Sequence, residues 1–281
     1  MKRIILSILA GLVFLSLLAF GAIGWVGSER ALRPAYRKYD WTLATYPDLR
    51  PEPFHVRTAD NITLEGRFFP GDRKSLVILA SGYGDTQDQM LSIGEFLHRA
   101  GYSVLTYNSR ARAPSGGEYV TLGVWEQGDL LSVVDYAAGR NDVDSSRIGV
   151  LGISRIRAVV DDSGFSDAPS VVAASFEHFI HLPAFPFAPL TVAIAGYRAG
   201  VDVNSVRPMA VIGQISPRPL LIIHDTGDLV VPTDNSRRNF AAAREPKELW
   251  LVEAAGHARA HTVVKPEYEK RVTAFFNSAI R

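Results

Sequence analysis

The chain has 281 residues, of which 47% are hydrophobic and 21% are charged, and its formal net charge is +1. This composition is typical of a globular protein with a sizeable core, and the balanced charge gives no electrostatic reason to expect a nucleic-acid partner. Because the sequence has no cysteine, disulfides, thiolate zinc sites and a cysteine nucleophile are excluded.

The N-terminus carries the clearest localisation signal. Two basic residues precede an uncharged, mostly apolar run from Ile4 to about Ser28. A helix of that length reaches roughly 35 Å, which is enough to cross a hydrocarbon core of about 30 Å. We therefore expect residues 1–28 to be a membrane anchor, with a signal peptide cleaved near residues 19–21 as the alternative. The leading basic pair favours an extracytoplasmic domain, although basic residues on the other flank oppose this orientation (Arg30, Arg33, Arg37 and Lys38).

Beyond a proline-containing linker at residues 29–53, residues 54–281 show the pattern of one α/β domain. A hairpin signal at Asp60-Asn61 comes first. Strands are then predicted at 75–80, 102–107, 147–153, 219–224 and 248–253, and helices at 89–100, 124–138, 235–244 and 266–280. This alternation predicts a mostly parallel sheet flanked by helices.

Residues 168–217 interrupt the alternation. The segment is too long for a plain connection and too apolar for a disordered one. We interpret it as a cap over an active site, with a structural excursion that has no function as the alternative.

Three residues that could act together follow three different predicted strands. Ser154 follows the strand at 147–153 in a Gly-x-Ser turn, which can expose a hydroxyl at the end of a strand. A nucleophilic serine needs a base and an orienting acid. Asp228 in "HDTGDLVVP" and His257 in "EAAGHARAH" follow the next two strands of that region. Each residue alone is as well explained by a turn or loop, but the ordered set predicts a Ser–Asp–His triad at one sheet edge.

From about His55 onward the chain resembles the α/β-hydrolase superfamily, in particular its prolyl-oligopeptidase-like and esterase-like members. The resemblance rests on "LASGYGDT", "GYSVLTYNSRARAPSGGEY", "DSSRIGVLGIS", "SPRPLLIIHDTGDLVVP", "AAGHARAH" and "YEKRVTAFF". It implies a serine hydrolase of esters, or less readily of amides or peptides, that works through an acyl-enzyme and needs no cofactor. The residues that it implies are the nucleophile Ser154, the acid Asp228, the general base His257, and the backbone N–H groups of Tyr83 and Arg155 as oxyanion donors.

The sequence departs from the family pattern at three places. Ser81-Gly82 replaces the usual His-Gly, and Ile156 stands at the last glycine of Gly-x-Ser-x-Gly. The third departure is that a strand resembling "AVVDDSGFSD" begins at about Ile156, without the helix that normally follows the nucleophile. A parallel crossover usually needs about a dozen residues or more. We therefore expect one face of the sheet to lose cover and the activity to be impaired.

Two other classes of function stay open at this stage. The chain could be a non-catalytic binding protein that keeps the hydrolase sheet, or a defective reading of a longer gene without a function of its own. The histidine pairs His178/His181 and His257/His261 could be imagined as metal ligands, but they lack further placed ligands, so we expect no metal. The expected partners are a small-molecule ester or peptide substrate and a membrane.

Overall fold

The structure is a computed structural model that describes residues 2–35, 38–151, 158–253 and 256–280. Within these ranges eight strands form one sheet in the order β1-β2-β4-β3-β5-β6-β7-β8. Strand β2 pairs antiparallel with β1 and β4, and every other neighbouring pair is parallel. The predicted mostly parallel sheet is therefore confirmed. The strands are β1 (Glu52–Arg57), β2 (Thr63–Phe69), β3 (Leu76–Ala80), β4 (Ser103–Tyr107), β5 (Ile148–Leu151), β6 (Val159–Asp162), β7 (Leu220–Asp225) and β8 (Lys247–Val252).

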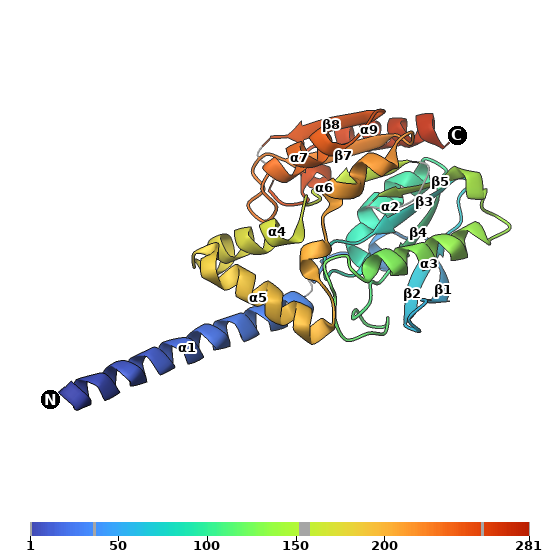
Figure 1. Cartoon of the computed structure of the whole chain (residues 1–281). Coiled ribbons are helices and arrows are strands. Elements are labelled where there is room, and N and C mark those ends of the chain that lie inside the picture. The colour runs from blue at the N-terminus through green and yellow to red at the C-terminus, as the bar shows by residue number, and fades with distance from the viewer. Residues whose placement is uncertain (1, 36–37, 152–157, 254–255, 281) are drawn as a thin grey trace.

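Helices flank the sheet and also form the N-terminal arm and the cap (Figure 1). The α-helices of the described residues are α1 (Lys2–Leu32), α2 (Leu91–Arg99), α3 (Glu126–Ala138), α4 (Ala168–Ser175), α5 (Ala184–Ala199), α6 (Pro208–Val211), α7 (Asp234–Ala242), α8 (Ala260–Val263) and α9 (Lys265–Ala279). Short 3₁₀ turns are η1 (Leu43–Thr45), η2 (Gln87–Met90), η3 (Ser145–Arg147), η5 (Val203–Ser205) and η6 (Ile212–Ile215), and η4 (Phe176–Ile180) is a π-helical turn. The four helices predicted outside the cap are present with shifted ends.

The sheet is buried on both faces. On one face, Leu97 of α2 and Phe276 of α9 share a core with Leu79 of β3. On the other face, Leu130 of α3 shares a core with Ile78 of the same strand. Successive side chains of a strand point to opposite faces, so the continuous apolar run of β3 is what a two-sided core requires.

Strand β6 occupies the place between β5 and β7 although little chain separates it from β5. It begins at Val159, later than the expected start near Ile156, and pairs in parallel with Val150 and Leu151. Only residues 152–158 lie between the two strands. Residues 152–157 are outside the described part of the chain.

The expectation that one face of the sheet loses its cover is wrong. Val150 and Val159 are both fully buried. Val150 belongs to the core beneath α3, and Val159 packs in a core with Ile212 and Ile215 of η6. The last segment of the cap therefore supplies apolar cover beside β6.

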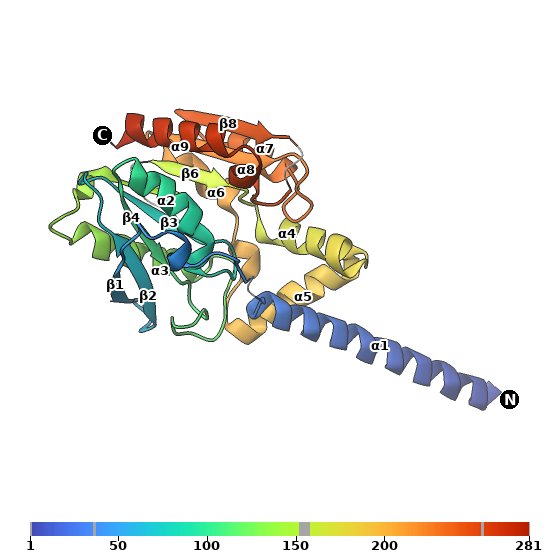
Figure 2. The same cartoon turned by 180° about the vertical axis from the view of Figure 1, so that it is seen from behind.

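The predicted cap at residues 168–217 contains α4 to α6 and the turns between them. Helix α4 begins with Asp167 as its N-cap, which accepts a hydrogen bond from the N–H of Ser170 at 2.9 Å. Helix α1 projects away from the body, and only its C-terminal end lies against the cap helix α5 (Figures 1 and 2).

Replacing Phe276 with alanine should lower the free energy of unfolding by about 3–5 kcal/mol, because the cavity left by a buried ring is not refilled. The ring is fully buried and lies on the sheet, since a Cβ built on Gly149 of β5 would be 2.6 Å from its Cε1 atom. Urea unfolding followed by tryptophan fluorescence measures the loss. Leu131→Ala on α3, where the side chain is 39% exposed, serves as the control and should cost less than about 1 kcal/mol. Equal losses in the two variants would contradict the packing described here.

Candidate active site

Asp228 lies in the turn that follows β7, at the carboxyl edge of the sheet. Its N–H donates to the carbonyl of Asp225 at 3.2 Å. Its Oδ1 accepts hydrogen bonds from the backbone N–H groups of Val230 and Val231, each at 2.8 Å. Because the carboxylate is also fully buried, the fold alone fixes its position.

His257 follows β8, which is the parallel neighbour of β7. Its Nδ1 donates a hydrogen bond to Oδ2 of Asp228 at 2.8 Å, and its side chain is 27% exposed. With the proton on Nδ1 in this bond, Nε2 is the basic nitrogen. The structure thus brings together the residues predicted as acid and general base, and we call them the acid–histidine pair.

The predicted nucleophile Ser154 and the predicted oxyanion donor Arg155 lie outside the described residues. What the structure gives is the strand before them: β5 ends at Leu151. Since β5 to β8 are all parallel, the chain leaves β5 at the same sheet edge that carries the acid–histidine pair.

Tyr83, the other predicted oxyanion donor, lies in the loop after β3. Gly84 in this loop has φ of +68°, and a Cβ there would lie 2.3 Å from Cγ of Pro34, so only glycine fits. The Tyr83 hydroxyl donates to the carbonyl of Ala31 in α1. Within the described part of the chain, no hydrogen bond from the Tyr83 backbone N–H is found. The loop is therefore tied to α1 while this N–H is left for another acceptor.

Two carboxylates that the sequence analysis missed lie beside the acid–histidine pair, the buried Asp225 and the partly buried Asp162. Asp225 ends β7 and accepts a hydrogen bond from the N–H of Arg259 at 2.9 Å, and burial raises the pKa of its carboxyl to about 6. Asp162 ends β6 and accepts from the hydroxyls of Ser163 at 3.0 Å and Tyr268 at 2.8 Å; burial raises its pKa as well. The available signal was an aspartate at the end of an otherwise apolar strand.

His224 stabilises the loop that carries Asp228, which we call the acid loop. It is fully buried, and its Nε2 donates to the carbonyl of Val231 at 2.8 Å. The same nitrogen lies 3.5 Å from Oδ2 of Asp228. Burial lowers the pKa of His224, so the ring is neutral near pH 7. Its hydrogen bond holds one of the two residues whose N–H groups fix the acid.

Asp161 is a third buried carboxylate, one residue before the end of β6. Burial is the main cause that raises its pKa to about 7, and the neighbouring Asp162 adds to the shift. Gly164 allows the chain to fold back over it, since a Cβ there would lie 2.0 Å from Oδ1 of Asp161. Among the described residues no hydrogen-bond partner is found for its Oδ2.

The two histidine pairs considered as metal ligands have separate surroundings. His257 faces Asp228, whereas Nε2 of His261 lies 3.4 Å from Oε1 of Glu269. His178 packs against the ring of Phe179 on the cap. In the ranges that the structure covers, no group of three or more metal-ligating side chains is found.

Known proteins similar to this chain are of two kinds, uncharacterized bacterial proteins and solved hydrolases. No family model matches the chain. It is 26% identical over 254 residues to the uncharacterized protein YqkD of Bacillus subtilis, covering 83% of this chain and 82% of that protein. The esterase Pf2001 of Pyrococcus furiosus superposes with a TM-score of 0.74 at 25% identity, covering 89% of this chain and 99% of the esterase. The α/β hydrolase GrgF from Penicillium sp. sh18 superposes with a TM-score of 0.67 at 20% identity, covering 83% and 99%.

Asp161 should make the protein less stable as the pH rises towards 7. Its pKa is near 7 in the folded chain and about 3.9 in an unfolded one, so the folded state binds the extra proton between these values and loses that stabilisation as the pH rises. Asp161→Asn mimics the protonated form and should raise the free energy of unfolding at pH 8 by about 2–4 kcal/mol, with little effect at pH 4. Urea titrations at both pH values test this. The exposed Asp135→Asn on α3 is the control, and equal pH dependence of all three proteins would contradict the assignment.

Proposed function

Because the chain belongs to the α/β-hydrolase superfamily, we propose that it hydrolyses carboxylic esters, and less readily amides or peptides, through an acyl-enzyme on Ser154. The observation that supports this most directly is the 2.8 Å hydrogen bond between Nδ1 of His257 and Oδ2 of Asp228. A buried, backbone-held carboxylate that binds one nitrogen of an imidazole orients the other nitrogen as the base for a serine hydroxyl.

The proposed reaction has two halves. The Ser154 oxygen attacks the ester carbonyl carbon while Nε2 of His257 takes its proton, and the oxyanion accepts hydrogen bonds from the N–H groups of Tyr83 and Arg155. Collapse of this intermediate breaks the bond to the alcohol oxygen, which receives the proton from His257. Water then attacks the acyl-enzyme with the same base and releases the acid and the free serine. Asp228 stabilises the imidazolium in both halves.

We propose that this activity is low. Only residues 152–158 separate β5 from β6, fewer than the dozen or so residues that a parallel crossover usually needs. The same observation favours the second candidate, a non-catalytic binding protein with a hydrolase sheet. Sequencing the coding DNA between the codons for Arg155 and Ile156 tests the third possibility, a defective reading of a longer gene.

α1 is long and apolar enough to cross a membrane. We propose that it anchors the chain, with the hydrolase domain on the extracytoplasmic side. The support for this orientation is the basic pair Lys2-Arg3 before the apolar run. Protease accessibility of the domain in intact cells, compared with lysed cells, tests it.

Ser154→Ala should abolish both labelling by a fluorophosphonate and hydrolysis of p-nitrophenyl butyrate. Loss of a serine nucleophile costs about 10⁶ in an efficient enzyme, so in a weak one we expect a loss of at least about 10². Fluorescence of the labelled band and release of p-nitrophenolate measure the two effects. Ser146→Ala is the matched control, because Ser146 is exposed and bonded only to Asp144. A folded wild-type protein that is neither labelled nor active would support the binding protein.

Asp228→Asn should lower kcat by about 10²–10⁴ with little change in KM, because an amide in place of the carboxylate favours the wrong histidine tautomer. The steady-state kinetics of ester hydrolysis measure the change. Asp234→Asn on α7, with a side chain that is 70% exposed, is the control and should leave kcat unchanged. Full activity of the Asp228 variant would exclude the acid–histidine pair from the reaction.

A further inference from the structure

Helix α1 and the cap helix α5 approach each other closely at two glycines. A Cβ on Gly24 would lie 2.6 Å from Cδ2 of Leu190, and a Cβ on Gly27 would lie 2.5 Å from Oγ1 of Thr191. Both distances are shorter than any ordinary contact of a Cβ atom, so a larger residue at either position would force the side chain of Leu190 or Thr191 to move. The C-terminal third of α1 is therefore a structural part of the cap and not a loose tether.

The two helices run in the same direction. At one end the rings of Phe20 and Phe187 are 5.5 Å apart, and at the other end the guanidinium of Arg198 pairs with Glu29. Along the interface of α1 and α5, the contacts thus change from aromatic near Phe20 to charged near Glu29. A bilayer boundary has the same polarity, from hydrocarbon to water.

The residues of α1 that lie in the hydrocarbon core determine how close the cap lies to the membrane surface. If the span starts at Ile4, a core of about 30 Å takes about 20 residues at 1.5 Å per residue and ends near Ile23. Phe20 then lies just inside the hydrocarbon and Glu29 outside it. Phe187, which contacts Phe20, is placed at the membrane boundary by this packing.

The part of the cap that precedes Phe187 exposes large apolar side chains, next to the exposed Glu177 and His181. Phe179, Ile180 and Phe185 are 58%, 36% and 79% exposed. Residues 178–197 contain no lysine, arginine, aspartate or glutamate. In both views the turn between α4 and α5 lies on the side of the molecule towards which α1 extends (Figures 1 and 2). We call these three side chains the cap tip.

An apolar core connects the cap with the loop that carries Asp228. Ile23 of α1, Val172 of α4 and Val192 of α5 belong to the same hydrophobic cluster as Val230 and Val231. The last two are the residues whose N–H groups hold the acid.

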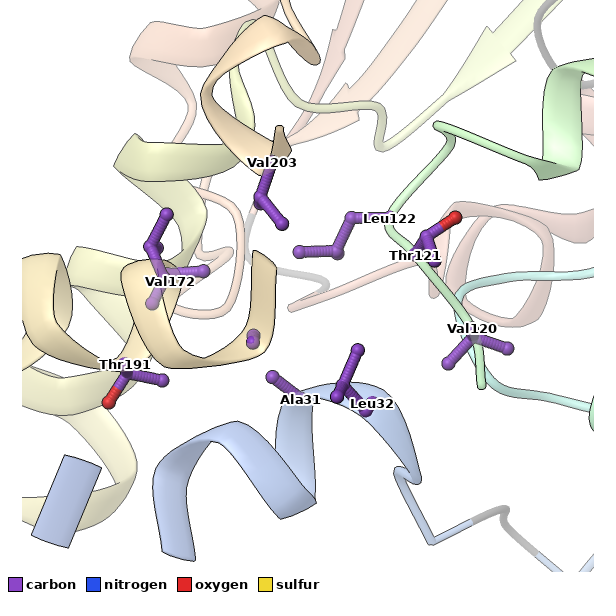
Figure 3. A pocket seen from close by; sticks show the side chains of 10 residues that line it. Ala31, Leu32, Val120, Thr121, Leu122, Val172, Thr191 and Val203 are labelled. Carbon is purple, nitrogen blue, oxygen red and sulfur yellow. The ribbon is translucent and has the colours of Figure 1, made fainter. Parts of the chain in front are cut away.

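A small cavity lies where α1 meets this core. Side chains from the end of α1, from the loop before α3, from α4 and from η5 surround it; they include Leu32, Leu122, Val172 and Val203 (Figure 3). Its lining is almost wholly apolar.

We infer that the cap tip is inserted in the surface of the bilayer beside α1, and that the substrate is a long-chain acyl ester taken from that bilayer. The second half rests on the hydrolase proposed above. The exposed cap tip and the position of α1 in the membrane support a lipid bilayer as the partner of this surface. The apolar core between the cap and the acid loop supports a substrate with a long acyl chain. Burial of the three exposed side chains in lipid is favourable by the same transfer free energy that buries a core side chain.

Single-cysteine labelling tests the insertion. Because the sequence has no cysteine, Phe185→Cys and the control Leu131→Cys each offer one site for an environment-sensitive nitrobenzoxadiazole label. The full chain is reconstituted in vesicles of phosphatidylcholine and phosphatidylglycerol, with and without doxyl-labelled lipid. We expect blue-shifted emission that doxyl lipid quenches at position 185, and neither effect at position 131. Equal behaviour at both positions would overturn the inference, and so would a shielded label that lipid does not quench, because a second protein copy would then cover the tip.

Vesicle kinetics test the substrate. The double variant Phe179→Ser/Phe185→Ser should hydrolyse a long-chain ester embedded in vesicles at least about tenfold more slowly than the wild type. Its hydrolysis of soluble p-nitrophenyl acetate should be unchanged, and Leu131→Ser should affect neither rate. A wild type that cleaves only the soluble ester would overturn the lipid substrate. A wild type that cleaves neither ester would overturn the proposed hydrolase, while the label at position 185 still decides the insertion.

Discussion

The hydrogen bond between Asp228 and His257 depends on how the sheet ends. β7 and β8 are parallel and in register to their last residues, so the loops after them emerge side by side. The acid loop is then fixed by backbone N–H groups and by the buried His224, none of which needs a substrate to be in place. A carboxylate held in this way loses little freedom when the imidazole becomes charged, and this preorganisation supports the proposed catalytic role of the pair.

The carboxylates around this pair lie where little water reaches. Charges interact more strongly there than they do in water. Asp225 interacts with the charge of His257, which lowers the pKa of Asp225 against the larger effect of burial. The hydroxyl of Tyr268 donates a hydrogen bond to one oxygen of Asp162. The N–H of Arg259 donates one to an oxygen of Asp225. Carboxylates thus surround the histidine, which suits the proposed role of His257 as a base.

The sequence predicted the strands and helices that have a strong hydropathy pattern. It did not predict features that depend on contacts between distant segments of the chain. Runs such as Leu76–Ala80 are apolar because they are covered on both faces, so their pattern alone predicts buried parallel strands. The order of Asp228 and His257 after two such strands predicted that they meet. Hydropathy treats aspartate as a surface residue, so it could not predict that Asp161 and Asp225 are buried. The cover that η6 gives Val159 comes from a segment more than 50 residues away in the chain, which local pattern does not encode.

The short connection between β5 and β6 is compatible with the sheet because the two strands overlap little. Among the described residues two pairs are in register, Val150 with Val159 and Leu151 with Val160. Ala158 therefore lies about two residues behind the end of β5 and one strand spacing to the side, roughly 8 Å from Leu151 by strand geometry. Seven residue steps can span more than 20 Å, by about 3.3 Å for each extended residue. The distance alone therefore does not require the helix that the family resemblance predicts here. The fold and the acid–histidine pair can thus persist while the proposed activity is weakened.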